Sequence, residues 1–309
     1  MNHRNLWIGM MMLVLNILTY SPVMAGLLGD AVNEGDIEKV VLLIEKGEDI
    51  KSKDALGRPL LHAAVAHRHL DIAELLISKG ADVNGRDQNG STPLQTASFW
   101  ASIKICEILI SNGAEIKKTD NFGFTPLHAA AGAFDSRDFG LAMMAIALTH
   151  NKDEANRLID ISELLISKGA DVNAMDKDGY TPLHWASTQG REGVAKVLIS
   201  KGGNVNARAK LQQTPLENAA FNGRIEVAKL LVSNGSDIHA KDDMGYTALH
   251  NAALGGHKDI AEYLISKGAD VNARSKGGFF KEGKTSLALA IEGGRKEVVE
   301  ILKKHGAEE

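Results

Sequence analysis

The sequence predicts an all-α solenoid of stacked helix-turn-helix units, because two landmarks repeat along the chain. The octapeptide Leu-Ile-Ser-Lys-Gly-Ala-Asp-Val occurs at Leu76–Val83, Leu165–Val172 and Leu264–Val271. A Thr-Pro-Leu motif recurs with its prolines at Pro93, Pro126, Pro182 and Pro215. Subtracting successive proline numbers gives 33, 56 and 33, so the repeat period is 33 and one copy carries an insertion of 23 (56 minus 33). Self-similarity at such a period indicates one supersecondary unit stacked on itself.

The segment 177–209 shows why each element of a unit should form. A tight turn contains Gly179, which is free to take a positive φ. Thr181 offers a side-chain oxygen as N-cap and Pro182 suits the first helical position, so a short helix begins there and ends at Gly190. A second helix with one apolar face follows over Glu192–Lys201. Neither helix can bury its apolar side except against the next copy.

These motifs carry a family resemblance. Gly-x-Thr-Pro-Leu-His-x-Ala, a Gly-(His/Arg) link and Leu-Leu-Ile-x-x-Gly-Ala-Asp-Val-Asn-Ala-x-Asp together resemble the ankyrin repeat. The strongest copies are Gly123–Ala130 joined to Leu164–Asp176, then Gly179–Asn206 and Gly245–Asn272. The resemblance covers nearly all of residues 26–309. It implies an ankyrin solenoid with β-turn or hairpin tips, whose tips and first helices line a concave side that binds proteins.

We expect about eight units in residues 26–309. They are an N-terminal cap (26–54), repeats 55–87, 88–120, 121–176, 177–209, 210–242 and 243–275, and a C-terminal cap (276–309). The insertion near 134–157 has apolar residues at helical spacing, which predicts a helical hairpin lengthening both helices of its repeat. It is either a second docking element or a packed elaboration.

Some units depart from the pattern without losing an apolar core position. Gln95 and Glu217 replace the motif histidine, Arg68 and Ala101 replace the linking glycine, Gln212 replaces the turn glycine, and His239 replaces the usual asparagine. These changes should alter local stability or surface chemistry and leave the fold intact.

The N-terminal segment 1–25 reads as a signal peptide. Basic residues precede an apolar run, Leu6–Leu18, and the small residues Val23 and Ala25 follow at the expected cleavage site. The run has about thirteen residues, fewer than the roughly 20 that span a bilayer, so a retained anchor is the weaker alternative. We therefore expect cleavage after Ala25 and a periplasmic or secreted protein.

Composition narrows the classes of function. The formal net charge is −4, and it becomes −5 when Arg4 is removed with the signal peptide. No basic stripe is visible, which argues against a nucleic-acid reader. Cys106, the only cysteine, falls in a small apolar slot and should be buried and inert. No nucleotide-binding, metalloprotease or hydrolase motif is present, so no enzyme activity, metal or cofactor is expected.

One position of the repeat motif holds a histidine in four units, which could suggest a series of metal sites. It holds His62, His128, His184 and His250. Zinc needs ligands that converge on one point, whereas these residues are a whole repeat apart, so structural hydrogen bonds are the preferred interpretation. Glu217 lies between His184 and His250 in stacking order, and its carboxylate would raise an imidazole pKa if the two formed an ion pair. A small-ligand or metal site using Glu217, His184, His239 and His250 stays open. His67-Arg68-His69 should form a solvated bend.

Aromatic and large apolar residues mark the predicted partner-binding surface. In the tips they are Phe122, Phe124, Tyr180, Leu211, Met244 and Tyr246; on the first helices they are Phe99, Trp100, Phe221 and Leu254; and the loop Lys276–Lys284 adds Phe279 and Phe280, as an edge contact or a lid. Such side chains are typical of binding hot spots, although several could be core residues.

The sequence therefore predicts an exported monomer that binds a partner protein through its concave face, as a scaffold, inhibitor or protector. The alternatives are a secreted effector acting on host proteins, a small-ligand or metal binder, and an enzyme with its site on the helical insertion.

Overall fold

The computed structural model describes residues 26–133, 152–277 and 283–308. Within these ranges the regular structure is helical, with isolated β-bridges but no strand. The α-helices are α2 (Leu27–Glu34), α3 (Ile37–Glu45), α4 (Leu60–Ala66), α5 (Leu70–Ser78), α6 (Pro93–Phe99), α7 (Ile103–Ser111), α8 (Pro126–Ala131), α10 (Lys152–Ser167), α11 (Pro182–Gln189), α12 (Glu192–Ser200), α13 (Pro215–Phe221), α14 (Ile225–Ser233), α15 (Ala248–Gly255), α16 (Lys258–Ser266), α17 (Ser286–Glu292) and α18 (Lys296–Lys304). The predicted all-α class is confirmed.

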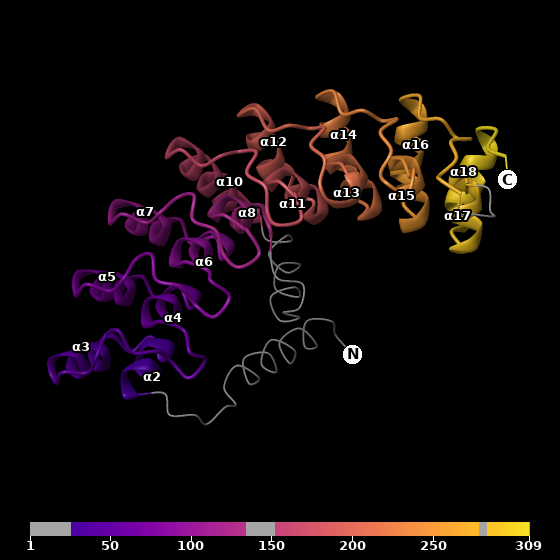
Figure 1. Cartoon of the computed structure of the whole chain (residues 1–309). Coiled ribbons are helices and arrows are strands. Elements are labelled where there is room, and N and C mark those ends of the chain that lie inside the picture. Colours follow the sequence, from indigo (N-terminus) through magenta and orange to yellow (C-terminus); the bar gives the residue numbers. More distant parts are fainter. Residues whose placement is uncertain (1–25, 134–151, 278–282, 309) are drawn as a thin grey trace.

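The helices stack in pairs along a curved solenoid. Figure 1 shows the first helix of each pair on the inner side of the arc and the second helix on the outer side. The leucine of each Thr-Pro-Leu motif is buried in a continuous core; examples are Leu94, Leu183 and Leu216. Burying such a side chain contributes about 2 kcal/mol, and much of this burial needs the neighbouring pair.

Threonine fixes the start of the first helices. Before α13, the Thr214 hydroxyl oxygen accepts a hydrogen bond from the Glu217 amide at 3.3 Å, and Pro215 occupies the first helical position. The same threonine hydrogen bond precedes α6, α8 and α17. Before α11 and α15, Thr181 and Thr247 also stand at the N-cap, and their hydroxyls contact Nδ1 of His184 and His250. The helices that follow these threonines therefore begin at the same place relative to their tips, as the sequence predicts.

The tips are joined by backbone hydrogen bonds. The Lys210 amide donates to the Asp178 carbonyl at 2.7 Å, and the Asp243 amide donates to the Leu211 carbonyl at 2.8 Å. The Lys276 amide continues the series. These bonds hold successive tips side by side and so align the side chains of the tips.

The Gly-(His/Arg) links between the two helices of a pair also join neighbouring pairs. Arg224 Nε donates to the Thr188 carbonyl at 3.1 Å, at the end of the preceding first helix, and Arg295 Nε donates to the Leu254 carbonyl at 3.2 Å. In these links the basic residue satisfies a carbonyl that the helix end leaves open.

The insertion lengthens only one of its two helices. α10 has 16 residues where α12 has 9, because it begins inside the insertion at Lys152. α8 ends at Ala131, where Gly132 adopts a left-handed φ of 103° and closes the helix. The expectation that both helices are lengthened was therefore wrong for the first. The remainder of the expected hairpin lies outside the described residues.

The predicted signal peptide also lies outside the described residues. Across the described ranges, no helix is both long enough and apolar enough to cross a membrane.

Candidate partner-binding groove

A groove of about 740 Å³ lies between the tips and the first helices of the central and C-terminal pairs. It brings together seven predicted site residues: Phe122, Phe124, Tyr180, Leu211, Phe221, Met244 and Tyr246. Leu254 lines it as well. The repeat stacking thus gathers residues that are more than a hundred positions apart in the chain.

Aromatic rings pack on one another in the part of the groove nearer α8 and α11. The Trp185 ring lies edge-on to Phe124 with ring centroids 5.3 Å apart, and its Nε1 donates to Asp176 Oδ2 at 3.0 Å. Tyr180 donates its hydroxyl hydrogen to Gln213 Oε1 at 2.6 Å. Phe124 is only 9% exposed because neighbouring rings cover it, so its predicted role as an exposed contact was wrong.

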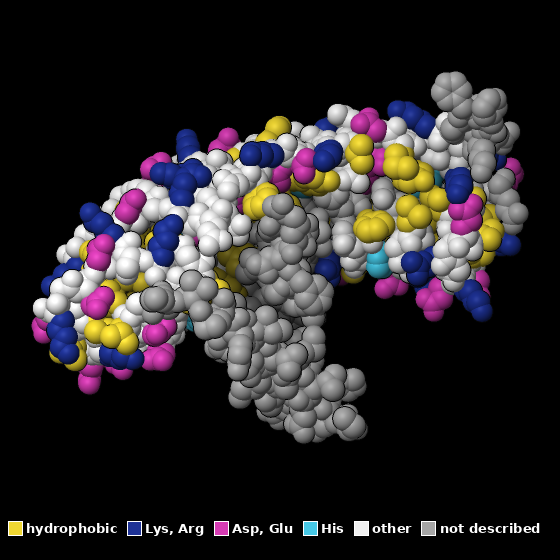
Figure 2. Space-filling model, turned by 60° about the horizontal axis from the view of Figure 1, so that its bottom comes forward, with side chains coloured by type: hydrophobic (Ala, Val, Ile, Leu, Met, Phe, Trp, Pro, Cys, Tyr) yellow, Lys and Arg dark blue, Asp and Glu magenta, His cyan; other side chains and the backbone are white. Residues whose placement is uncertain are grey.

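Large apolar side chains are exposed in the other part of the groove. Leu211, Phe221 and Met244 are 50%, 51% and 51% exposed. Leu211 lies in the tip before α13, Met244 lies in the tip before α15, and Phe221 is the last residue of α13. Figure 2 shows hydrophobic side chains gathered over the C-terminal half of the solenoid, in the region of these helices. Apolar side chains that are exposed together in one groove, and not scattered singly, mark a candidate interaction site.

An unusual turn presents Leu211. This tip contains a 3-10 turn, η1 (Lys210–Gln212), in which Leu211 and Gln212 have φ angles of 57° and 60°. Non-glycine residues avoid this left-handed region, at a cost of about 1–2 kcal/mol each. Gln212 stands where Gly179 provides the corresponding conformation in the preceding tip. The chain therefore holds Leu211 at the groove in a strained turn.

Several predicted site residues do not join the groove. Phe99 is 7% exposed because its ring packs edge-on against Trp100, with centroids 5.2 Å apart, so its predicted exposure was wrong. Trp100 is partly buried at the end of α6 and does not line the groove. Phe279 and Phe280 lie outside the described residues.

The motif histidines form a structural ladder. His184 Nδ1 contacts Thr181 Oγ1 at 2.9 Å, and its Nε2 contacts the Gln213 carbonyl of the next tip at 3.2 Å. His128 and His250 make the equivalent contacts. Burial lowers the pKa of His128 and of His184 to about 4, so both rings are neutral near pH 7. The predicted hydrogen-bonding role is confirmed.

Glu217 does not form the ion pair that its place between two histidines allows. Burial raises its pKa to about 7, and burial also lowers the pKa of the neighbouring His184 and His250. A His–Glu ion pair would shift these groups the other way. Among the described residues no histidine pairs with Glu217, whose Oε2 instead accepts a hydrogen bond from the Thr214 amide at 2.8 Å, so the structure supports the structural hydrogen bond.

The described residues offer no metal centre. They contain no group of three or more His, Cys, Asp or Glu side chains placed to hold an ion. His184 and His250 already use both ring nitrogens within the ladder. Cys106 is fully buried beside Ser98, and burial raises its pKa to about 12, which fits an unreactive thiol.

Some groove residues were not predicted from the sequence, and three of them share one motif position. Trp185, Asn218 and Asn251 each follow the motif position occupied by histidine or Glu217, and all three line the groove. Phe221 and Leu254 lie three residues after Asn218 and Asn251, on the same helix face. The periodicity of the first helix therefore carried this signal: positions one and four after the histidine face the groove.

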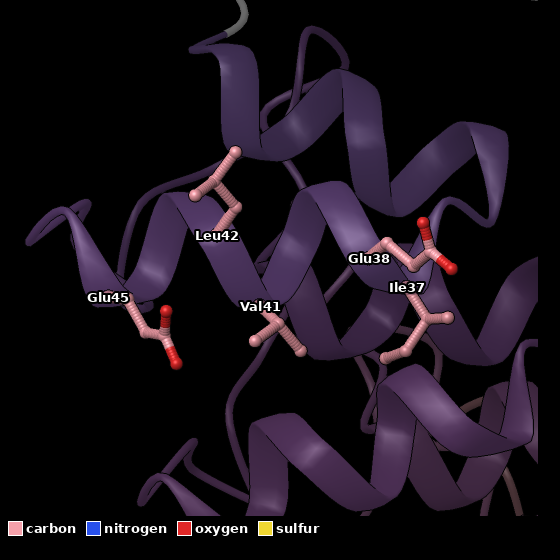
Figure 3. A pocket seen from close by; sticks show the side chains of 5 residues that line it. All are labelled: Ile37, Glu38, Val41, Leu42 and Glu45. Carbon is pink, nitrogen blue, oxygen red and sulfur yellow. The ribbon is translucent and has the colours of Figure 1, made fainter.

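A second hollow lies on the outer surface of the N-terminal pair. Figure 3 shows its walls, which come from α3 alone: Ile37, Glu38, Val41, Leu42 and Glu45. With a volume of about 370 Å³, it is smaller than the groove and no second element contributes to its lining. It provides a control surface with exposed apolar side chains.

The structure is thus a curved solenoid of helix pairs, with a groove lined by tips and first helices. A family model described as "Ankyrin repeats (3 copies)" matches residues 28–120, 143–242 and 216–309. The chain belongs to the ankyrin repeat family. Its repeats indicate protein–protein interaction, as the resemblance implied. The comparison with curated protein sequences gives no match.

Proposed function

We propose that the protein binds a partner protein stoichiometrically, without catalysis, through the groove lined by α11, α13, α15 and their tips. One observation carries this proposal: Leu211, Phe221 and Met244 are each about half exposed within a single groove, next to the half-buried Tyr246. Burying such side chains against a partner stabilises complexes by about 2 kcal/mol or more per hot-spot residue.

The groove favours a protein partner over a nucleic acid. Its lining contains the acidic residues Asp176, Asp178 and Asp242 and the titratable Glu217, with Lys177 as the basic residue. Phosphate backbones bind to clusters of lysine and arginine, and this surface has the opposite balance. The partner therefore meets an apolar and mildly acidic surface.

We also propose where in the cell the protein acts. The sequence of residues 1–25 supports export and cleavage after Ala25, and thus a location in the periplasm or outside the cell. Export of the full-length chain from a bacterial host, followed by mass analysis, tests this. A product beginning at Gly26 is expected, and a full-length product held in the membrane fraction contradicts it.

Partner capture tests the groove. The Leu211→Ser, Phe221→Ser, Met244→Ser triple variant should keep its thermal stability, because these side chains are half exposed. It should lose about 100-fold or more in affinity for a partner captured from the exported fraction. Leu42→Ser, on the outer face of α3, is the matched control and should bind normally. Unchanged binding by the triple variant contradicts the groove assignment.

A further inference from the structure

The side chain at the histidine position of each motif has two separate tasks. In α6 the position is Gln95, whose Oε1 accepts a hydrogen bond from the Thr92 amide at 2.7 Å. Its Nε2 donates to the carbonyl of Phe124, which belongs to the next tip. One oxygen therefore faces the residue's own cap, and one N–H reaches the next repeat.

Glu217 performs the first task and lacks the group for the second. Its Oε2 accepts from the Thr214 amide at 2.8 Å, as Gln95 Oε1 does in its own repeat. Its Oε1 is buried and has no hydrogen-bond partner. Since glutamate and glutamine share one shape, Oε1 takes the place of the Gln95 nitrogen.

The corresponding acceptor in the next tip is the carbonyl of Tyr246, because 246 minus 217 equals 124 minus 95. This carbonyl accepts the Asp242 amide at 2.9 Å. The Phe124 carbonyl accepts the Asp120 amide at 3.1 Å in the same way and still takes the hydrogen of Gln95. A carbonyl oxygen has two lone pairs, so Tyr246 retains one for a donor from α13.

We propose that Glu217 is a proton-dependent joint between the α13–α14 and α15–α16 pairs: its protonated carboxyl donates to the Tyr246 carbonyl, and its carboxylate leaves that bond unmade.

The surroundings of Glu217 favour the protonated form. Burial is the largest influence and raises its pKa from 4.5 to about 7; Asp242 raises it further, whereas Arg208 and the bonds from Thr214 lower it. The flanking groups on the adjacent helices are His184 on α11 and His250 on α15. Burial lowers the pKa of both, so neither supplies a positive charge near neutral pH.

The sign of the effect follows from linkage. Between about pH 4.5 and 7 the folded protein holds a proton that the unfolded chain releases. The contribution of Glu217 to stability is therefore complete below pH 4.5, declines as the pH rises to about 7, and is constant above that. Glu217 and Tyr246 also line the groove, so the joint would regulate binding there; that consequence rests on the proposed function, whereas the joint itself does not.

Glu217→Gln supplies a permanent donor and tests the joint. In urea denaturation of the full-length protein, the variant should match the wild type at pH 5. At pH 8 its folding equilibrium constant should exceed the wild-type value by roughly 10- to 100-fold. An equal ratio of the two constants at pH 5 and pH 8 would overturn the proposal.

Gln95→Glu is the reciprocal variant. It places a glutamate at the joint between α6 and α8, where the native residue donates to Phe124. It should therefore create the pH dependence that Glu217→Gln removes. A Gln95→Glu protein whose stability changes with pH just as the wild type does would count against the joint.

A direct titration keeps the proposal testable if a variant folds poorly. With ¹³C-labelled glutamate carboxyls in the wild-type protein, one signal should titrate near pH 7 and should be missing in Glu217→Gln. If the Glu217 signal titrates near 4.5, the joint is overturned. None of these measurements involves a partner, so their failure would leave the groove assignment standing, and failed partner capture would leave the joint standing.

Discussion

Arg68 reaches across one whole helix pair to bind Glu154. Its Nη2 lies 3.0 Å from Glu154 Oε1, although Arg68 belongs to the bend between α4 and α5 and Glu154 to the first turn of α10. The pair α6–α7 lies between them in the chain. Repeat proteins usually contact only nearest neighbours, so this ion pair depends on the extension that the insertion gives to α10.

A double-mutant cycle should detect this long-range contact. Arg68→Ala, Glu154→Ala and the double variant should give a coupling free energy of about 0.5 kcal/mol, because Arg68 is 38% exposed and water screens the pair. Urea denaturation in low salt measures it, and roughly 1 M salt should abolish it. The exposed pair Lys196 and Glu192, within α12, is the control with a comparable coupling. Zero coupling in low salt would mean that α10 is not tied to the α4–α5 bend.

The sequence predicts the periodic features well because each repeat satisfies the same physical demand. Thr181, Pro182 and Gly190 act in the structure as their local chemistry predicts. The groove was harder to predict. Phe99 and Phe221 occupy the same motif position, four residues after Gln95 and Glu217, yet Phe99 is covered by Trp100 and Phe221 is half exposed. Exposure depends on the neighbouring side chain, which a repeat pattern does not specify. The Arg68–Glu154 contact likewise joins parts that no period relates.

Gln212→Gly should stabilise the protein by about 0.5–1 kcal/mol, because glycine adopts a left-handed φ without steric strain. Gln212 has a positive φ and an exposed side chain. The greater freedom of glycine in the unfolded chain offsets part of the gain. Gly179→Ala is the opposite control: its φ is 78°, and an added Cβ meets only an ordinary contact at 3.4 Å. Its loss of about 1 kcal/mol therefore isolates the backbone effect. A lower urea midpoint for Gln212→Gly would refute the strain at this tip.

His239→Asn should add two hydrogen bonds between neighbouring repeats. At the equivalent position, Asn206 donates from Nδ2 to the Gly235 carbonyl at 3.0 Å, and its Oδ1 accepts from the Asp237 amide at 2.8 Å. Asn206 bonds to groups 29 and 31 positions later in the chain. At the same separations from residue 239 lie the Gly268 carbonyl and the Asp270 amide. We expect a gain of about 1 kcal/mol in unfolding free energy. Asn206→Ala should lower the unfolding free energy by a similar amount. An unchanged urea midpoint for His239→Asn would show that the contact between the turns after α14 and α16 differs in geometry from the one at Asn206.

His184→Gln should make the protein less sensitive to acid. Burial lowers the pKa of His184 from 6.5 to about 4, so the unfolded chain takes up a proton in this range before the folded protein does. The contribution of His184 to stability is therefore complete above pH 6.5 and declines as the pH falls towards 4, by up to about 3 kcal/mol. Glutamine keeps both hydrogen bonds, as Gln95 does, and does not titrate.

Urea denaturation at pH 7 and pH 4.5 should show similar stability for both proteins at pH 7 and a clear advantage for His184→Gln at pH 4.5. His305→Gln, on an exposed residue beyond α18, is the matched control. Equal acid sensitivity of wild type and His184→Gln would mean that His184 does not enter the fold as a neutral ring.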